Sequence, residues 1–212
     1  MSNMFFEASA FNQDLSKWDT SKVEYMDSMF YNANHFNQDL SEWETSKVEY
    51  MDYMFSVSSY VTSAFNGDVS EWKTGKVANM GYMFQGATAF NQHLFWDTSL
   101  VTNMRSLFKG AVAFNGDVSE WNTSEVTSMD QMFNGATAFT GDLSAWDVSK
   151  SRSSSSTREN IPEARCSLCP PATGSSPQTS PRSRPPWTFG AERVGSTPSS
   201  CTATSPPGTS PA

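Results

Sequence analysis

Large apolar side chains recur along the first 150 residues at intervals of three and four, separated by polar residues. On a helix, with 100° between successive residues, each set would form one stripe about 120° wide that could face a core. The first set consists of Val23, Met26, Met29, Phe30 and Ala33, and equivalent sets begin at Val77 and Val126. This spacing predicts a series of short amphipathic helices.

Polar residues at both ends of these sets are typical of helix boundaries. Ser21 with Glu24, and Ser46 with Glu49, have the spacing of capping boxes, in which side chains bind the free amides of the first helical turn. Helices often end on a residue in the left-handed conformation. We expect that conformation two residues after the phenylalanine of each set, at Asn32, Gly86, Gly110 and Gly135.

The segment before each predicted helix reads Phe-Asn-x-Asp-(Leu/Val)-Ser-x-Trp in its regular form. A single Leu or Val between polar residues predicts a short strand of about three residues. The segment occurs six times, and its first residues are separated by 25, 29, 25, 24 and 25 positions. Its copies begin at Phe11, Phe36, Phe65, Phe90, Phe114 and Phe139.

A period in this range predicts stacked units rather than one globular core. We therefore expect residues 1–150 to form an α/β solenoid, a stack in which each unit of about 25 residues contributes a short strand and a short helix. The aromatic residues of each copy should form ladders through the core. These ladder residues are Phe11, Trp18, Phe36, Trp43, Phe65, Trp72, Phe90, Trp96, Phe114, Trp121, Phe139 and Trp146. Because the last unit is incomplete after Lys150, Trp146 should contribute less stability than Trp72.

Two units depart from this pattern. Nine residues instead of five follow Phe55 before the next copy, which predicts a loop at one corner. The unit at Phe90 is one residue short, so Phe95 directly precedes Trp96 and His93 stands where the other units have Asp.

The composition changes abruptly after Lys150. All 11 prolines and all three cysteines lie in residues 151–212, whereas all 11 methionines lie before them. Such a segment lacks the apolar residues for a core and is expected to be a disordered, Ser/Pro-rich tail. Cys166 and Cys169 supply only half of a zinc motif, so we expect no metal site there. One hypothesis for the change is out-of-frame or unspliced sequence; a mucin-like stalk is the alternative.

Charge and residue types exclude several function classes. Residues 1–150 carry 19 acidic and 8 basic side chains, which argues against a nucleic-acid-binding surface. The two histidines, His35 and His93, fall in different units, and no carboxylates are placed as an acid–base pair, so we expect neither an enzyme nor a cofactor. No apolar run approaches the roughly 20 residues that span a bilayer. The N-terminus lacks the pattern of a signal peptide.

The recurring aspartates are the candidate binding surface. Stacked strands lie about 4.8 Å apart, so a column of carboxylates would repel itself unless other groups compensated it. Each Asp could bind a following Ser or backbone amide, the column could bind cations, or it could face a basic partner. The column consists of Asp14, Asp39, Asp68, His93, Asp117 and Asp142.

Two further polar sets recur. The Asn that follows the ladder Phe, from Asn12 to Asn115, is expected to bind the backbone of the neighbouring unit and so tie the turns together. A second exposed set is rich in tyrosine, which suits recognition of a partner. It comprises Glu24, Tyr25, Asp27, Tyr31, Glu49, Tyr50, Asp52 and Tyr53.

The full repeat, Phe-Asn-x-Asp-Leu-Ser-x-Trp-Asp-Thr-Ser-x-Val-x-x-Met-x-x-Met-Phe-x-x-Ala, resembles that of the BspA-like leucine-rich-repeat surface proteins, which is also found in mycoplasma-type surface lipoproteins. The similarity covers residues 1–150. It implies a right-handed leucine-rich-repeat-like solenoid with a surface or extracellular binding role, often proposed to be adhesion. The family has no established catalytic residues, so the resemblance implies no site residues here.

The expected function is therefore non-enzymatic binding by a surface or adhesion-type repeat protein, with a protein or a glycan as partner. An intracellular protein-interaction scaffold is the alternative, and the chain could also be a fragment of a larger repeat protein. Because no signal peptide is evident, a cytoplasmic location stays open. Both ends cut through a unit, so the uncapped ends could self-associate.

Overall fold

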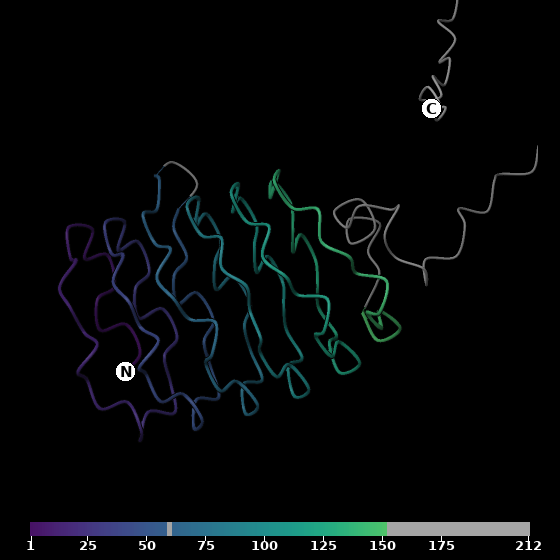
Figure 1. The fold of residues 1–212 in the computed structure, drawn as a ribbon, viewed down its shortest axis with the longest axis horizontal. Coiled ribbons are helices and arrows are strands. Elements are labelled where there is room, and N and C mark those ends of the chain that lie inside the picture. Colours follow the sequence, from purple (N-terminus) through teal and green to yellow (C-terminus); the bar gives the residue numbers. More distant parts are fainter. Residues whose placement is uncertain (59–60, 152–212) are drawn as a thin grey trace, which may run out of the picture. The chain divides into compact units, whose positions relative to one another are not determined.

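The computed structural model of the chain describes residues 1–58 and 61–151, all of which belong to one unit, Met1–Ala172. Over these residues the backbone winds into successive coils that lie side by side and bond to one another (Figure 1). Each coil corresponds to one sequence repeat, and we number the coils along the chain. Coils 1 to 5 begin at Phe11, Phe36, Phe65, Phe90 and Phe114, with residues 1–10 before them and residues 139–151 after them.

The predicted α/β solenoid of strand-plus-helix units is wrong. The described residues contain no helix and no strand, and their only ladder pairing is a row of isolated parallel bridges. The capping boxes at Ser21 and Ser46 therefore have no helix to cap. The bridges join Tyr25 to Tyr50, Tyr50 to Asn79, Asn79 to Asn103, and Asn103 to Ser128.

The apolar residues that predicted helices lie instead at the ends of four-residue turns. The Met29 amide donates to the Met26 carbonyl at 3.3 Å, and the Ala33 amide donates to the Phe30 carbonyl at 3.0 Å. Because a turn brings its first and fourth residues together, a spacing of three is shared by helices and by successive turns. All four of these side chains are buried in the core, as a helix would also have placed them.

The third residue of both of these turns has a positive φ, as a type II turn requires. In coil 1 these residues are Ser28, with φ of 54°, and Asn32, with φ of 55°. The left-handed conformation predicted at Asn32 and its three glycine equivalents is confirmed, with φ between 55° and 79°, but it belongs to a turn and not to a helix end. At Gly86 a Cβ would also lie 2.4 Å from the Val57 carbonyl oxygen, so this turn requires glycine.

Alternate amides in the second half of each coil bond to the next coil. The Met26 amide donates to the Tyr50 carbonyl at 3.0 Å, and the Phe30 amide donates to the Met54 carbonyl at 2.9 Å. A helix would use these same amides within its own segment. The neighbouring coil satisfies them instead, and burial of the backbone therefore depends on stacking.

Aromatic ladders run through the core of the stack. The Trp72 ring lies between those of Trp43 and Trp96, with ring centroids 6.3 Å apart in both pairs. Its indole nitrogen also donates to the Leu40 carbonyl of the preceding coil at 2.9 Å. The predicted ladder residues are buried except at the start of the stack, where Phe11 is half-buried and Trp18 is 37% exposed.

The predicted tail, residues 151–212, lies outside the described residues except for Ser151. The same holds for Cys166, Cys169 and Cys201.

Candidate functional site

The aspartates of the predicted binding column close local turns. The Asp14 carboxylate accepts a hydrogen bond from the Ser16 amide at 2.8 Å, as in an Asx turn. In coil 4, His93 takes a different role, since its Nδ1 accepts the Asp117 amide at 3.1 Å. Bonds of 2.9 Å to the serine two residues later occur at Asp39, Asp68, Asp117 and Asp142. Of the three interpretations that the sequence leaves open, turn bonding is the one that these contacts support.

These bonds also stabilise the charged form of the carboxyl groups. The backbone amide of Ser16, followed by its hydroxyl, holds the pKa of Asp14 below its ordinary value. The Ser119 amide and hydroxyl likewise lower the pKa of Asp117, and nearby His93 adds a smaller effect. Among the described residues, no group of three or more His, Cys, Asp or Glu side chains is placed to hold a metal ion.

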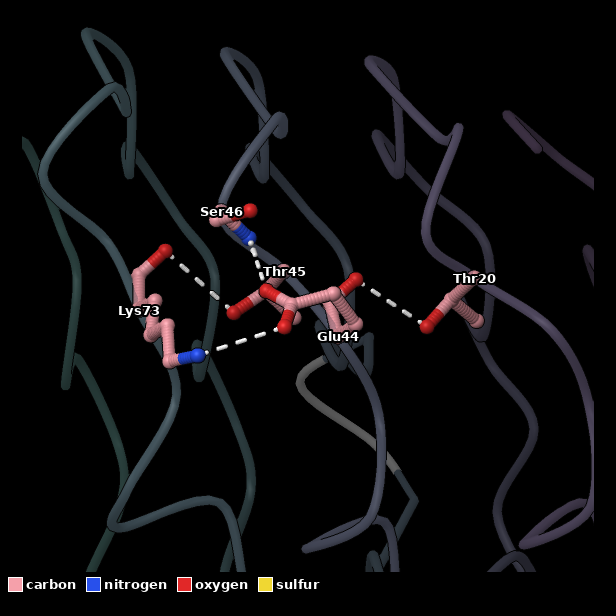
Figure 2. Close-up of polar contacts among 5 residues, drawn as sticks. All are labelled: Thr20, Glu44, Thr45, Ser46 and Lys73. Carbon is pink, nitrogen blue, oxygen red and sulfur yellow. Dashed lines mark hydrogen bonds and ion pairs between the residues drawn. The ribbon is translucent and has the colours of Figure 1, made fainter.

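A second column of such turns follows the tryptophans and was missed by the sequence reasoning. Asp19 accepts the Ser21 amide at 3.0 Å. Figure 2 shows the equivalent bond of the next coil, in which Glu44 accepts the Ser46 amide at 3.0 Å. In coil 3 the residue after the tryptophan is Lys73 instead of an acidic residue, and its ammonium lies 3.2 Å from the Glu44 carboxylate. Equivalent turns occur at Asp97, Asn122 and Asp147. The recurring Trp-Asp-Thr-Ser sequence was the signal for this column.

One buried threonine in each coil bonds to the next coil at the same corner. The Thr20 hydroxyl donates to the Glu44 carbonyl at 3.0 Å, and the Thr45 hydroxyl donates to the Lys73 carbonyl at 3.3 Å (Figure 2). The bond is repeated at Thr74, Thr98 and Thr123. This corner is therefore a hydrogen-bonded network between coils.

The asparagines after the ladder phenylalanines have the structural role that the sequence predicts. The Asn37 amide donates to the Asn12 side-chain oxygen at 2.9 Å, and the same bond is repeated in each following coil. In coil 2, the Gln38 side-chain amide donates to the same Asn12 oxygen at 2.8 Å. The prediction that Asn ties the turns together is confirmed.

The two histidines bind backbone groups of neighbouring coils. The Nδ1 atom of His35 lies 2.7 Å from the Ser9 carbonyl oxygen, and that of His93 accepts the Asp117 amide. They lie in coils 1 and 4, so the structure does not bring them together in one site.

Aromatic rings recur in the second halves of coils 1 to 3 and in the segment before them. Phe6, Tyr25 and Tyr50 are exposed, whereas Tyr31, Tyr53 and Tyr82 are half-buried. The rings of Tyr25 and Tyr50 stack at 5.5 Å between centroids, and these residues are 47% and 39% exposed. A parallel run of rings begins at Phe6 and continues through Tyr31, Tyr53 and Tyr82, with centroid distances of 4.9, 6.4 and 4.5 Å. We call these six residues, with the four carboxylates described next, the tyrosine face.

Carboxylates accompany the rings of the tyrosine face. They belong to Glu24, Asp27, Glu49 and Asp52. Burial raises the pKa of Asp52, and the negative charge of Asp27 raises that pKa further. The Ser2 hydroxyl donates to the Asp27 carboxylate. The tyrosine face therefore combines aromatic rings with several carboxylates. One of these carboxylates, that of Asp52, is partly desolvated.

Comparison with known proteins identifies one family. The family described as "Mycoplasma protein of unknown function, DUF285" matches residues 1–95 and again residues 57–165. Overlapping matches are expected when a chain repeats one unit. No curated protein and no solved structure matches the chain. Within the part of the chain that the structure describes, no helix is long and apolar enough to cross a membrane.

Proposed function

We propose that this chain, which belongs to the DUF285 family of Mycoplasma proteins of unknown function, is a non-enzymatic binding protein that contacts its partner through the tyrosine face. The observation that carries this proposal is the stacked, exposed pair of Tyr25 and Tyr50. Their backbones are joined by a parallel bridge, so both rings are presented on a fixed support. Tyrosines contribute large contact areas at low entropic cost and are enriched at binding surfaces.

The charge of the tyrosine face favours a basic protein segment as partner. A Lys or Arg side chain can approach an aromatic ring and a carboxylate together, gaining a cation–π contact and an ion pair. Such a group near Asp52 would offset the repulsion from Asp27 that raises its pKa. The aspartates of the turn columns are less suited to this role, because each already accepts a serine amide.

The place of this binding is proposed to be the cell surface. The resemblance of the repeat to the BspA-like surface proteins supports that location and an adhesion-type role. Labelling intact cells that express the complete gene product with an antibody against the repeats tests it. Staining only after permeabilisation would instead favour the intracellular scaffold.

Selection from a displayed library of random peptides tests the partner chemistry. We expect enriched peptides to be rich in Lys and Arg. The double variant Tyr25→Ala/Tyr50→Ala should weaken their binding at least about tenfold, which corresponds to about 1.4 kcal/mol. Enrichment of acidic peptides, or binding only to glycans in a parallel array, would contradict the proposed partner.

Two charge-matched variants separate local contacts from the effect of net charge. Glu24→Gln/Glu49→Gln and Asp14→Asn/Asp39→Asn each remove two negative charges from coils 1 and 2. Only the first pair lies on the tyrosine face, so only that pair should weaken binding strongly. Equal losses for the two pairs would mean that the peptides respond to overall charge.

A further inference from the structure

Coil 4 has a notch where the other coils have a turn. In coil 5 the Trp121 amide donates to the Val118 carbonyl at 3.2 Å and closes a four-residue turn. Coil 3 forms the same turn, with the Trp72 amide donating to Val69 at 3.4 Å. Coil 4 is one residue shorter, and its Leu94 and Trp96 are only two positions apart, so this turn cannot form. The row of turns is therefore interrupted at coil 4, between the turns of coils 3 and 5.

Phe95 stands in this notch as an exposed apolar side chain. It is 69% exposed, more than any other large apolar residue that the structure describes. On the coil-5 side, a hollow of about 190 Å³ lies between Phe95 and the turn that ends at Trp121. On the coil-3 side, a second and wider hollow of about 510 Å³ lies between Phe95, Trp72 and Lys73. An apolar projection thus lies directly beside concave surfaces that could receive an apolar side chain.

The two sides of the notch differ in charge. The coil-3 hollow is lined by two basic side chains, Lys73 and Lys76, and by two carboxylates, Glu71 and Asp97. The coil-5 hollow is lined by Asp117 and Glu120, without a basic residue. Basic side chains therefore line the notch only on its coil-3 side, whereas the coil-5 side carries carboxylates alone.

We propose that the notch is a self-association site at which two copies of this chain bind through a two-fold contact. Each Phe95 side chain occupies the coil-5 hollow of the other copy, beside Trp121. The two-fold axis runs across the stack through the notch, so the coil-3 side of one copy faces the coil-5 side of the other. This arrangement brings Lys73, which within its own chain pairs with Glu44, also towards Glu120 of the second copy.

A second copy is favoured as occupant because one surface supplies both halves of the contact. An isologous interface requires a patch that is complementary to itself. The notch meets this requirement in shape, with a projection beside a hollow, and in charge, because the lysines of the coil-3 side can face the carboxylates of the coil-5 side. This site lies on coils 3 to 5, apart from the paired Tyr25 and Tyr50 of the tyrosine face, and the inference does not depend on the proposed function.

Sedimentation of the full chain over a concentration series tests the proposal. The wild-type protein should pass from monomer to dimer and stop at dimer, whereas Phe95→Ser should weaken association at least about tenfold. Leu100→Ser is the matched control, because Leu100 is a 54% exposed apolar residue of the same coil that lines neither hollow. It should dimerise like the wild type. Because Phe95 is exposed, its replacement should leave the thermal unfolding of the monomer unchanged.

A charge exchange tests the orientation of the two copies. Lys73→Glu and Glu120→Lys should each weaken the dimer, and the double variant should restore it. A wild-type chain that stays monomeric would overturn the proposal, as would a Phe95→Ser variant that associates like the wild type. Growth beyond the dimer would show that the ends of the stack associate instead. Failure of the double variant to recover would rule out the proposed two-fold contact.

Discussion

At the scale of single residues, small polar side chains hold neighbouring coils together. Each threonine at the corner places its methyl group and hydroxyl in a buried position, where the hydroxyl finds a carbonyl of the next coil. The asparagines act as acceptors, since their side-chain oxygens accept hydrogen bonds from backbone amides of the next coil. A buried polar group without a partner destabilises the folded state, so these residues cannot be replaced freely by apolar ones of similar shape.

Thr74 offers a direct test of this role. Its hydroxyl donates to the Asp97 carbonyl at 2.9 Å, and the side chain is buried. Thr74→Val preserves the shape but leaves that carbonyl without its donor, and should lower the free energy of unfolding by about 1–3 kcal/mol. Thr74→Ser keeps the hydroxyl and should retain more of the stability. Urea unfolding of the two variants decides the matter; if valine proved the better substitute, the hydrogen bond would not be the reason for threonine.

At the scale of the element, the unit of this fold is the hydrogen-bonded turn. Turns with an apolar residue at each end face the core, and Asp-x-Ser turns shape the outer corners. In both kinds the backbone curves sharply, and in the apolar turns alternate amides donate to carbonyls of the neighbouring coil. The tyrosine face arises because the outward residues between the apolar turns carry rings in coils 1 to 3.

The Asp-x-Ser turns predict a loss of stability in acid. Serine amides or hydroxyls lower the pKa of six carboxyls, a shift that stabilises the folded state above the ordinary carboxyl pKa and is lost as pH falls through the lowered values. Asp52 opposes this trend, because burial raises its pKa. The six are Asp14, Asp19, Glu44, Asp97, Asp117 and Asp147.

Urea midpoints measured between pH 7 and pH 2 should therefore fall steadily below about pH 4. Asp97→Asn, which removes one of these titrating groups, should make the decline shallower. Asp52→Asn should raise the midpoint at pH 7, and its advantage should disappear in acid because both side chains are then neutral. A midpoint that rose on acidification would contradict the assignment of these turns.

At the scale of the whole molecule, the contribution of a residue depends on its position in the stack. Trp72 is covered on both sides by neighbouring indoles and donates to Leu40. Trp18, at the start of the stack, is 37% exposed. The expectation that Trp146 would be the weakly held tryptophan does not agree with its burial, since it is 1% exposed and donates to the Val118 carbonyl at 3.0 Å.

Truncation of these tryptophans measures the gradient along the stack. Trp72→Ala should lower the free energy of unfolding by about 3–5 kcal/mol, as large truncations in a core do. Trp18→Ala should have a much smaller effect, because its ring is partly exposed and its burial contributes less. Thermal or urea unfolding of the two variants provides the comparison. Equal losses would mean that stability is shared across the whole unit rather than between neighbouring coils.

Several features could be read from the sequence because they depend on the period alone. Phe65 and Trp72 had to be internal, since a repeated large aromatic can be buried only by stacking on its own copies. Asn37 could be assigned to the turns because its role repeats with that same period. The candidate site was harder to predict from the sequence. The tyrosines formed a recurring polar and aromatic set, but the more regular Asp column was the stronger candidate for a binding surface.

The period, the buried aromatic columns and the polar residues that join successive coils all followed from the amino-acid pattern. The choice between helix and turn at Met26, Met29 and Phe30 required the folded stack, because a spacing of three suits both. The Met26 amide can bind the Tyr50 carbonyl only when coil 2 is in place. The notch at Phe95 likewise depends on the neighbouring coils. A missing residue is visible in the sequence, but the hollow beside Phe95 exists because coils 3 and 5 keep the turn that coil 4 has lost.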